Sequence, residues 1–145
     1  MKFKTVYWVI AAIIIAHVVL LVTGLYFQIH NLDVPMHILG GFAMGLFAIA
    51  IYSFVFSNFR VLPPLWFKFL FVVGFALLIG VAWEWHEFLI DLTITNRYGW
   101  EQYQLSISDT MWDFANDFIG AVIAFVIFRQ KLSDTKKQNK ILKRK

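Results

Sequence analysis

The 145-residue sequence contains no cysteine and few charged residues, since Asp, Glu, Lys and Arg together make up 15% of it. The lack of cysteine excludes disulfides, thiolate metal ligands and cysteine nucleophiles. The serine-nucleophile motif Gly-x-Ser-x-Gly is also missing. Hydrophobic residues instead make up 60% of the chain and aromatic residues 19%. This composition is typical of a small polytopic membrane protein.

Four long apolar runs contain most of the hydrophobic residues. Each run is close to the roughly 20 residues that a bilayer-spanning helix needs, and none shows the alternation of lipid-facing strands. The sequence therefore predicts an all-α integral membrane four-helix bundle, formed by a single domain of residues 1–130. The expected helices cover residues 5–27, 35–56, 65–90 and 110–128.

Basic residues are scarce on one side of the predicted membrane. Of the 13 lysines and arginines, all but Arg97 precede the first run, lie in or beside the second connection, or follow the fourth run. The positive-inside rule then predicts that both the N-terminus and the C-terminus are cytoplasmic. Residues 131–145 are expected to form a basic cytoplasmic tail that contacts anionic lipid headgroups, with no role in nucleic-acid binding.

Acidic residues gather on the opposite side. The chain has nine, and eight of them lie at the ends of apolar runs that would meet away from the tail. These eight are Asp33, Glu84, Glu87, Asp91, Glu101, Asp109, Asp113 and Asp117. Carboxylates in or beside hydrocarbon are costly unless they are paired, protonated or bound to a cation, so the concentration predicts a functional site.

Helical spacing places the acids of the third run on one face. At about 100° per residue, Glu84, Glu87 and Asp91 fall within a stripe about 60° wide. A helix C-terminus already carries partial negative charge, so three acids there need compensation. Capping does not explain these residues.

The second and fourth runs begin with acids that have two interpretations. Asp33 is either the N-cap of its helix or, with His37 four residues later, part of a binding site. Asp109 is either a site residue or half of a capping box with Ser106. Asp113 and Asp117 continue at four-residue spacing into the predicted bundle and have no capping role.

Antiparallel connections bring these three helix ends together. The sequence therefore predicts one outward-facing cavity, and its metal ligands would be His37, Glu84, Glu87, Asp113 and Asp117. Such a set suits a divalent ion, and the pattern does not choose among Mg²⁺, Mn²⁺, Ca²⁺, Zn²⁺ and iron. Asp91 or Asp33 could serve as a catalytic base. Arg97 is the residue expected to bind an anionic substrate, because it alone supplies positive charge on this side.

These motifs resemble a known group of proteins. The features are Asp33-x-x-x-His37 before a glycine pair, Trp83-Glu84-x-x-Glu87, and Asp109-Thr110-x-x-Asp113-x-x-x-Asp117. Together they resemble the small YjdF-like membrane proteins and, more distantly, VanZ-like proteins. The resemblance implies a multi-helix bacterial or archaeal membrane protein, and hence a multi-pass location in the prokaryotic plasma (inner) membrane. It adds little chemistry.

Three functions fit these observations. The first is a metal-binding membrane protein that acts on a membrane lipid or lipid-linked substrate, as a metal-dependent hydrolase or transferase. The second is a proton- or cation-coupled transporter subunit, which would form a homo-oligomer or join a partner membrane protein; His17 in the first run would extend its polar path. The third is a non-enzymatic accessory protein whose acids are satisfied by a partner.

Overall fold

The computed structural model describes residues 3–29, 31–56, 62–100, 102–103 and 106–132. Among these residues it has four helices that are long and apolar enough to cross a membrane. The predicted all-helical fold is therefore confirmed. Most of the predicted basic tail, together with Glu101, lies outside the described residues, and the proposed orientation of the termini stays a prediction.

The first helix is shorter than expected. Helix α1 covers Phe3–Val22 and is followed by the single turn α2, Leu25–Gln28. The break falls at Gly24, whose φ of 69° lies in the left-handed region that favours glycine. The expected helix over residues 5–27 is wrong at its C-terminal end because the apolar run continues through this glycine turn.

The other three helices begin or end near their expected residues. Helix α3 covers Asp33–Val55 and α6 covers Ile107–Phe128, after which a 3₁₀ turn covers Arg129–Leu132. Helix α4 covers Leu65–Ile90 and continues through a π-helical turn, Asp91–Thr95, into α5, Asn96–Tyr98. Gly99, with a φ of 69°, ends this long helical segment.

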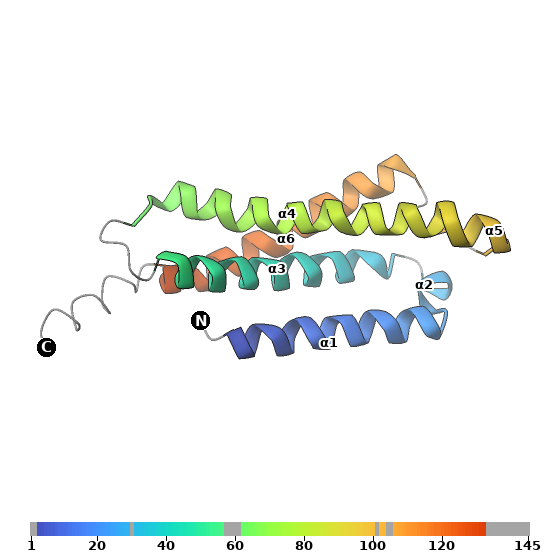
Figure 1. Cartoon of the computed structure of the whole chain (residues 1–145), viewed down its shortest axis with the longest axis horizontal. Helices are drawn as coiled ribbons and strands as arrows, with labels where there is room; N and C mark the ends of the chain where they lie inside the picture. The colour runs from blue at the N-terminus through green and yellow to red at the C-terminus, as the bar shows by residue number, and fades with distance from the viewer. Residues whose placement is uncertain (1–2, 30, 57–61, 101, 104–105, 133–145) are drawn as a thin grey trace, which may run out of the picture.

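Helix α3 occupies the centre of the bundle. It lies between α1 and α4, and α6 crosses behind it (Figure 1). The most extensive contact is between α3 and α6, and α1 packs mainly on α3. Helix α1 is consequently little buried, with Val6 as its one buried residue among those described.

Glycines allow α3 and α6 to approach closely. A Cβ atom at Gly41 would overlap the backbone of Asp117, and one at Gly120 would overlap the carbonyl of Ile38. Small residues at a crossing let two backbones meet in a membrane, where helix association depends on packing rather than on the hydrophobic effect. This close crossing brings the first turns of α3 next to α6 at the depth of Asp117.

The buried apolar side chains concentrate toward one end of the bundle. We call this the apolar half; it contains the last turns of α3, the first turns of α4 and the last turns of α6. Its main cluster is Ala48, Ile49, Tyr52, Val72, Phe125 and Leu132. The opposite end, called the acidic half, contains the start of α3, the end of α4 and the start of α6.

Candidate metal centre

Three helices each place acidic or imidazole side chains inside the acidic half. His37 comes from the second turn of α3, Glu84 from the later turns of α4, and Asp113 and Asp117 from α6. The side chains are nearly covered, with 10% of His37, 4% of Glu84, 6% of Asp113 and 7% of Asp117 exposed. In the structure, the polar residues of the second, third and fourth apolar runs therefore meet, as the sequence predicted.

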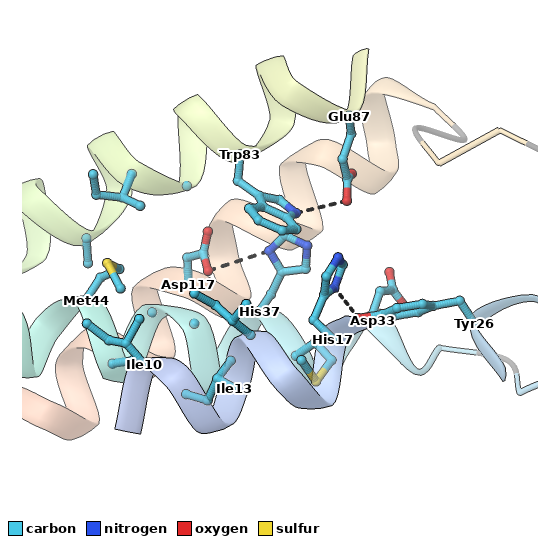
Figure 2. A pocket seen from close by; sticks show the side chains of 18 residues that line it. Ile10, Ile13, His17, Tyr26, Asp33, His37, Met44, Trp83, Glu87 and Asp117 are labelled. Carbon is cyan, nitrogen blue, oxygen red and sulfur yellow. Dashed lines mark hydrogen bonds and ion pairs between the residues drawn. The ribbon is translucent and has the colours of Figure 1, made fainter. Parts of the chain in front are cut away.

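The His37 imidazole faces three carboxylates. Its Nε2 atom lies 3.9 Å from Glu84 Oε1 and 3.7 Å from Asp113 Oδ1. Its Nδ1 atom lies 3.5 Å from Asp117 Oδ1 (Figure 2). One imidazolium balances one carboxylate, so three ionised carboxylates around it leave negative charge in a covered site. Shared protons or a bound cation must supply the balance.

Glycines on two helices make room for Asp117. A Cβ atom at Gly80 of α4 would collide with Asp117 Oδ2, and a Cβ at Gly41 of α3 would collide with the Asp117 backbone. Asp117 is thus enclosed by backbone on both sides. Because neither glycine has a side chain, the Asp117 carboxylate fits between α3 and α4 inside the bundle.

Two sets of ligand atoms are close enough to hold a metal ion. His37, Glu84 and Asp113 offer atoms that lie within 4.8 Å of one another, and Asp33, Asp109 and Asp113 form a second such set. Asp113 belongs to both. The first set is the better covered of the two, while Asp33 and Asp109 are partly exposed. The arrangement is compatible with one covered ion and with a second ion nearer the end of the bundle.

The structure distinguishes the two capping interpretations. Asp33 is the first residue of α3, so the N-cap position is Leu32, which makes no side-chain cap bond. Asp33 instead belongs to the second acidic set. Ser106 is the N-cap of α6, and its hydroxyl accepts a hydrogen bond from the Asp109 amide at 3.1 Å. The Ser106 cap is confirmed, and it starts α6 three residues earlier than expected.

Glu87 is held apart from the first set. Its Oε1 atom accepts a hydrogen bond from Trp83 Nε1 at 2.9 Å, one helical turn away. Glu87 still lines the same cavity as His37 and Asp117 (Figure 2). Of the five predicted ligands, His37, Glu84 and Asp113 therefore form a set, Asp117 adjoins it through His37, and Glu87 faces the cavity from α4.

Asp91 does not join the other acids of its predicted stripe. Its carboxylate accepts hydrogen bonds from Thr95 Oγ1 at 2.8 Å and from the Tyr103 amide at 3.0 and 3.1 Å. These bonds tie the connection after α5 to the end of α4. Asp91 lines a separate small cavity with Gln102, and Arg97 is exposed on α5. Neither is in the metal-ligand sets of the described residues.

Three aromatic or imidazole residues near the site were not predicted as site residues. His17 Nδ1 lies 2.7 Å from the Tyr26 hydroxyl, and the His17 ring meets Trp83 edge-on with centroids 4.9 Å apart. With the Trp83 bond to Glu87, these contacts join α1 and α2 to α4. His17 carried a signal in the sequence, as an imidazole inside an apolar run, whereas Tyr26 and Trp83 could not be told from interfacial aromatics.

The surroundings of Tyr26 raise the pKa of its hydroxyl. Burial, followed by the nearby Glu87 and Asp33 carboxylates, raises the pKa of Tyr26 to about 12. The raised pKa favours the neutral hydroxyl, which is hydrogen-bonded to His17. Carboxylates from both α3 and α4 thus lie close enough to Tyr26 to raise its pKa.

A cavity of about 380 Å³ adjoins the first set of ligands. Its polar lining comes from five helices: α1, α2, α3, α4 and α6. The polar residues are His17, Tyr26, Asp33, His37, Trp83, Glu87 and Asp117. Its volume is within the range of roughly 300–1,000 Å³ that is usual for small-molecule sites.

Residues 3–133 match the model of a family described as "Predicted membrane protein (DUF2238)". The chain belongs to this family. The match covers all four long helices and the whole candidate site, and the YjdF-like resemblance agrees with it. The VanZ-like resemblance is not confirmed. No curated protein and no solved structure matches the chain.

Proposed function

We propose that this membrane protein binds a divalent metal ion at His37, Glu84 and Asp113, with Asp117 beside them, and uses it on a lipid or lipid-linked substrate. The single observation that carries the proposal is the covered imidazole facing carboxylates from two other helices within 3.9 Å. Hard divalent ions prefer oxygen ligands, and one imidazole extends the choice to Zn²⁺, Mn²⁺ and iron.

The surrounding residues are suited to hold such an ion. Asp117 is close to His37 Nδ1 and can fix the orientation of the ring while Nε2 faces the other two carboxylates. A hydrogen bond on the second nitrogen of a metal-binding histidine is the usual way to select its tautomer. A bound divalent ion would supply Lewis-acid polarisation of a phosphoryl or carbonyl oxygen, or a more acidic bound water.

Residues around the cavity can then serve a hydrolase or transferase. Glu87 faces the cavity and is held by Trp83, so it is better placed than Asp91 to accept a proton there. Asp33 also lines the cavity and keeps the role of alternative base. Arg97, exposed on α5, would meet an anionic group only outside the cavity. Asp91 is engaged in holding the connection to Tyr103.

Transport is the weaker proposal. A transport path would need polar groups through the apolar half, where Ala48, Ile49, Val72 and Phe125 are packed together. Lys68 is buried there, but its Nζ donates to the Leu132 carbonyl at 3.2 Å. We propose that the protein lies in the prokaryotic plasma membrane, with the acidic half facing outward by the positive-inside rule.

Metal content tests this proposal. Protein purified in detergent, without added metal, should contain about one divalent ion per chain by elemental analysis, and chelator should lower its melting temperature. A ligand whose free concentration is about 100 times its Kd stabilises the folded state by about 2.7 kcal/mol. Metal-free protein whose stability is the same with chelator and with each of Mg²⁺, Mn²⁺, Ca²⁺, Zn²⁺ and Fe²⁺ would overturn it.

A further inference from the structure

We infer that the cavity beside the metal centre binds the hydrocarbon chain of a membrane lipid whose head carries hydroxyl or amine groups. This inference deepens the proposed function by naming the class of substrate. It rests on that function only for what happens to the head, because the apolar walls of the cavity lie outside the metal-ligand sets, whereas its polar lining shares Asp33, His37 and Asp117 with the metal centre.

The cavity is apolar at one end and polar at the other. Ile10 and Met44 lie at the end toward the middle of the bundle, Asp117 and His37 lie between, and Tyr26, Asp33 and Glu87 lie at the opposite end (Figure 2). Ala43, Ala76 and Ile79 complete the apolar walls. A long apolar compartment ending in polar groups matches an amphiphile, with its chain along the helices and its head near the acids.

The cavity opens toward the bilayer. Ile14 of α1 and Ile79 of α4 both line it, and they are 55% and 38% exposed. Both residues lie within helices that are long and apolar enough to cross the membrane, so the space outside them is hydrocarbon. Helix α1 packs mainly on α3, and α1 with α4 is not among the helix pairs in extensive contact. A ligand dissolved in the bilayer can enter there without crossing water.

The polar end selects the head by charge. The cavity lining includes the carboxylates of Asp33, Glu87 and Asp117, and none of the described residues that line the cavity is Lys or Arg. A hydroxyl or an amine can donate hydrogen bonds to these carboxylates, whereas a carboxylate head would meet more carboxylates than the His37 imidazole can balance. The cavity therefore favours alcohols and amines when no metal is bound.

Photolabelling tests the site directly. The full-length protein in lipid nanodiscs, with chelator present, is exposed to long-chain fatty alcohol, fatty amine or fatty acid probes that carry a diazirine in the chain, and the labelled peptides are mapped. The alcohol and amine should label the cavity walls on α1 and α4. The fatty acid should label them about tenfold less, because of the like charges.

A matched pair of variants separates the cavity from the general lipid surface. Ile79→Trp fills the opening and should reduce cavity labelling by the alcohol about tenfold. Leu78→Trp is the control, because Leu78 is the adjacent residue, is 65% exposed and does not line the cavity; it should leave labelling unchanged. Both positions are exposed, so both variants should keep the melting temperature of the parent protein.

Two results would overturn the inference. Labelling spread evenly over the lipid-facing surface and unaffected by Ile79→Trp would show that the cavity holds no chain. Equal cavity labelling by the fatty acid in chelator would show that the head class is wrong. Metal content, measured on the same samples before chelation, keeps the two proposals apart: cavity labelling in a protein that binds no metal supports this inference while the proposed function fails.

Discussion

The two halves of the bundle are built on the same helices but on different chemistry. In the apolar half, α3, α4 and α6 meet through side chains such as Ile49, Val72 and Phe125. In the acidic half the same helices meet through His37 and carboxylates. Buried apolar contacts fix the fold, whereas buried acids cost stability unless something compensates them. The difference shows that one half supports the structure and the other is arranged for binding.

The crossing that joins the two halves should be the most sensitive point of the fold. A side chain at Gly41 would overlap the Asp117 backbone, which cannot move without shifting α6. Gly41→Val should therefore abolish folded protein or lower the unfolding free energy by about 3 kcal/mol or more. Yield after detergent extraction and the melting temperature measure this loss.

Gly74→Val is the control for this substitution. Gly74 is exposed on α4, and a Cβ there meets no atom within 4 Å. Its yield and melting temperature should match those of the parent protein. If the two valine variants behave alike, the close approach at Gly41 is not what holds α3 and α6 together.

Removal of one carboxylate should separate binding from folding. Asp113 belongs to both ligand sets, so Asp113→Asn should weaken binding of the metal found in the purified protein by more than about 100-fold. Competition with a chromophoric chelator gives the affinity. Asp109→Asn, at the partly exposed second set, is the comparison and should change affinity less than Asp113→Asn. Equal losses would make the second set the main site.

Asp91 should affect the connection after α5 and leave metal binding intact. Asp91→Ala removes the acceptor of the partly buried Tyr103 amide, and an unsatisfied donor costs at most about 1–3 kcal/mol, the range for a fully buried one. Hydrogen exchange of the segment around Tyr103 should speed up, while metal affinity should equal that of the parent protein. A large fall in metal affinity with unchanged exchange would return Asp91 to the site.

Lys68 should matter least, although it is a buried charge. It lies in the apolar half, with its Nζ atom 5.9 Å from the centre of the Tyr52 ring. Replacing buried charged groups with apolar side chains of similar volume is often neutral or stabilising. Lys68→Met should therefore change the unfolding free energy by no more than about 1 kcal/mol and leave metal content unchanged. Loss of metal in this variant would mean that the two halves are coupled.

The sequence predicted the helices well because long apolar runs leave few alternatives in a membrane. It predicted the end of the first helix wrongly, since the left-handed turn at Gly24 lies inside an apolar run. The third helix ends at Ile90 as expected, but the sequence did not predict that the chain continues through the π-helical turn Asp91–Thr95 and α5 before Gly99 ends the helical segment.

Helical phase predicted which acids point inward, but it could not assign their partners. Glu84, Glu87 and Asp91 share a stripe in the sequence and have three different surroundings in the structure. Glu84 faces His37, Glu87 is held by Trp83, and Asp91 holds the Tyr103 amide. These outcomes depend on the spacing between helices and on a loop contact, which the periodicity of one helix does not contain.

The central claim is that one imidazole and several carboxylates hold a divalent ion in the acidic half. Pulsed electron paramagnetic resonance of the protein loaded with one equivalent of Mn²⁺ tests it most directly, by detecting nitrogen coordinated to the metal. We predict the signal of one imidazole, lost in His37→Gln and retained in His86→Gln, whose parent histidine is exposed on α4. Bound Mn²⁺ with no nitrogen signal, or a signal that survives His37→Gln, would contradict the account.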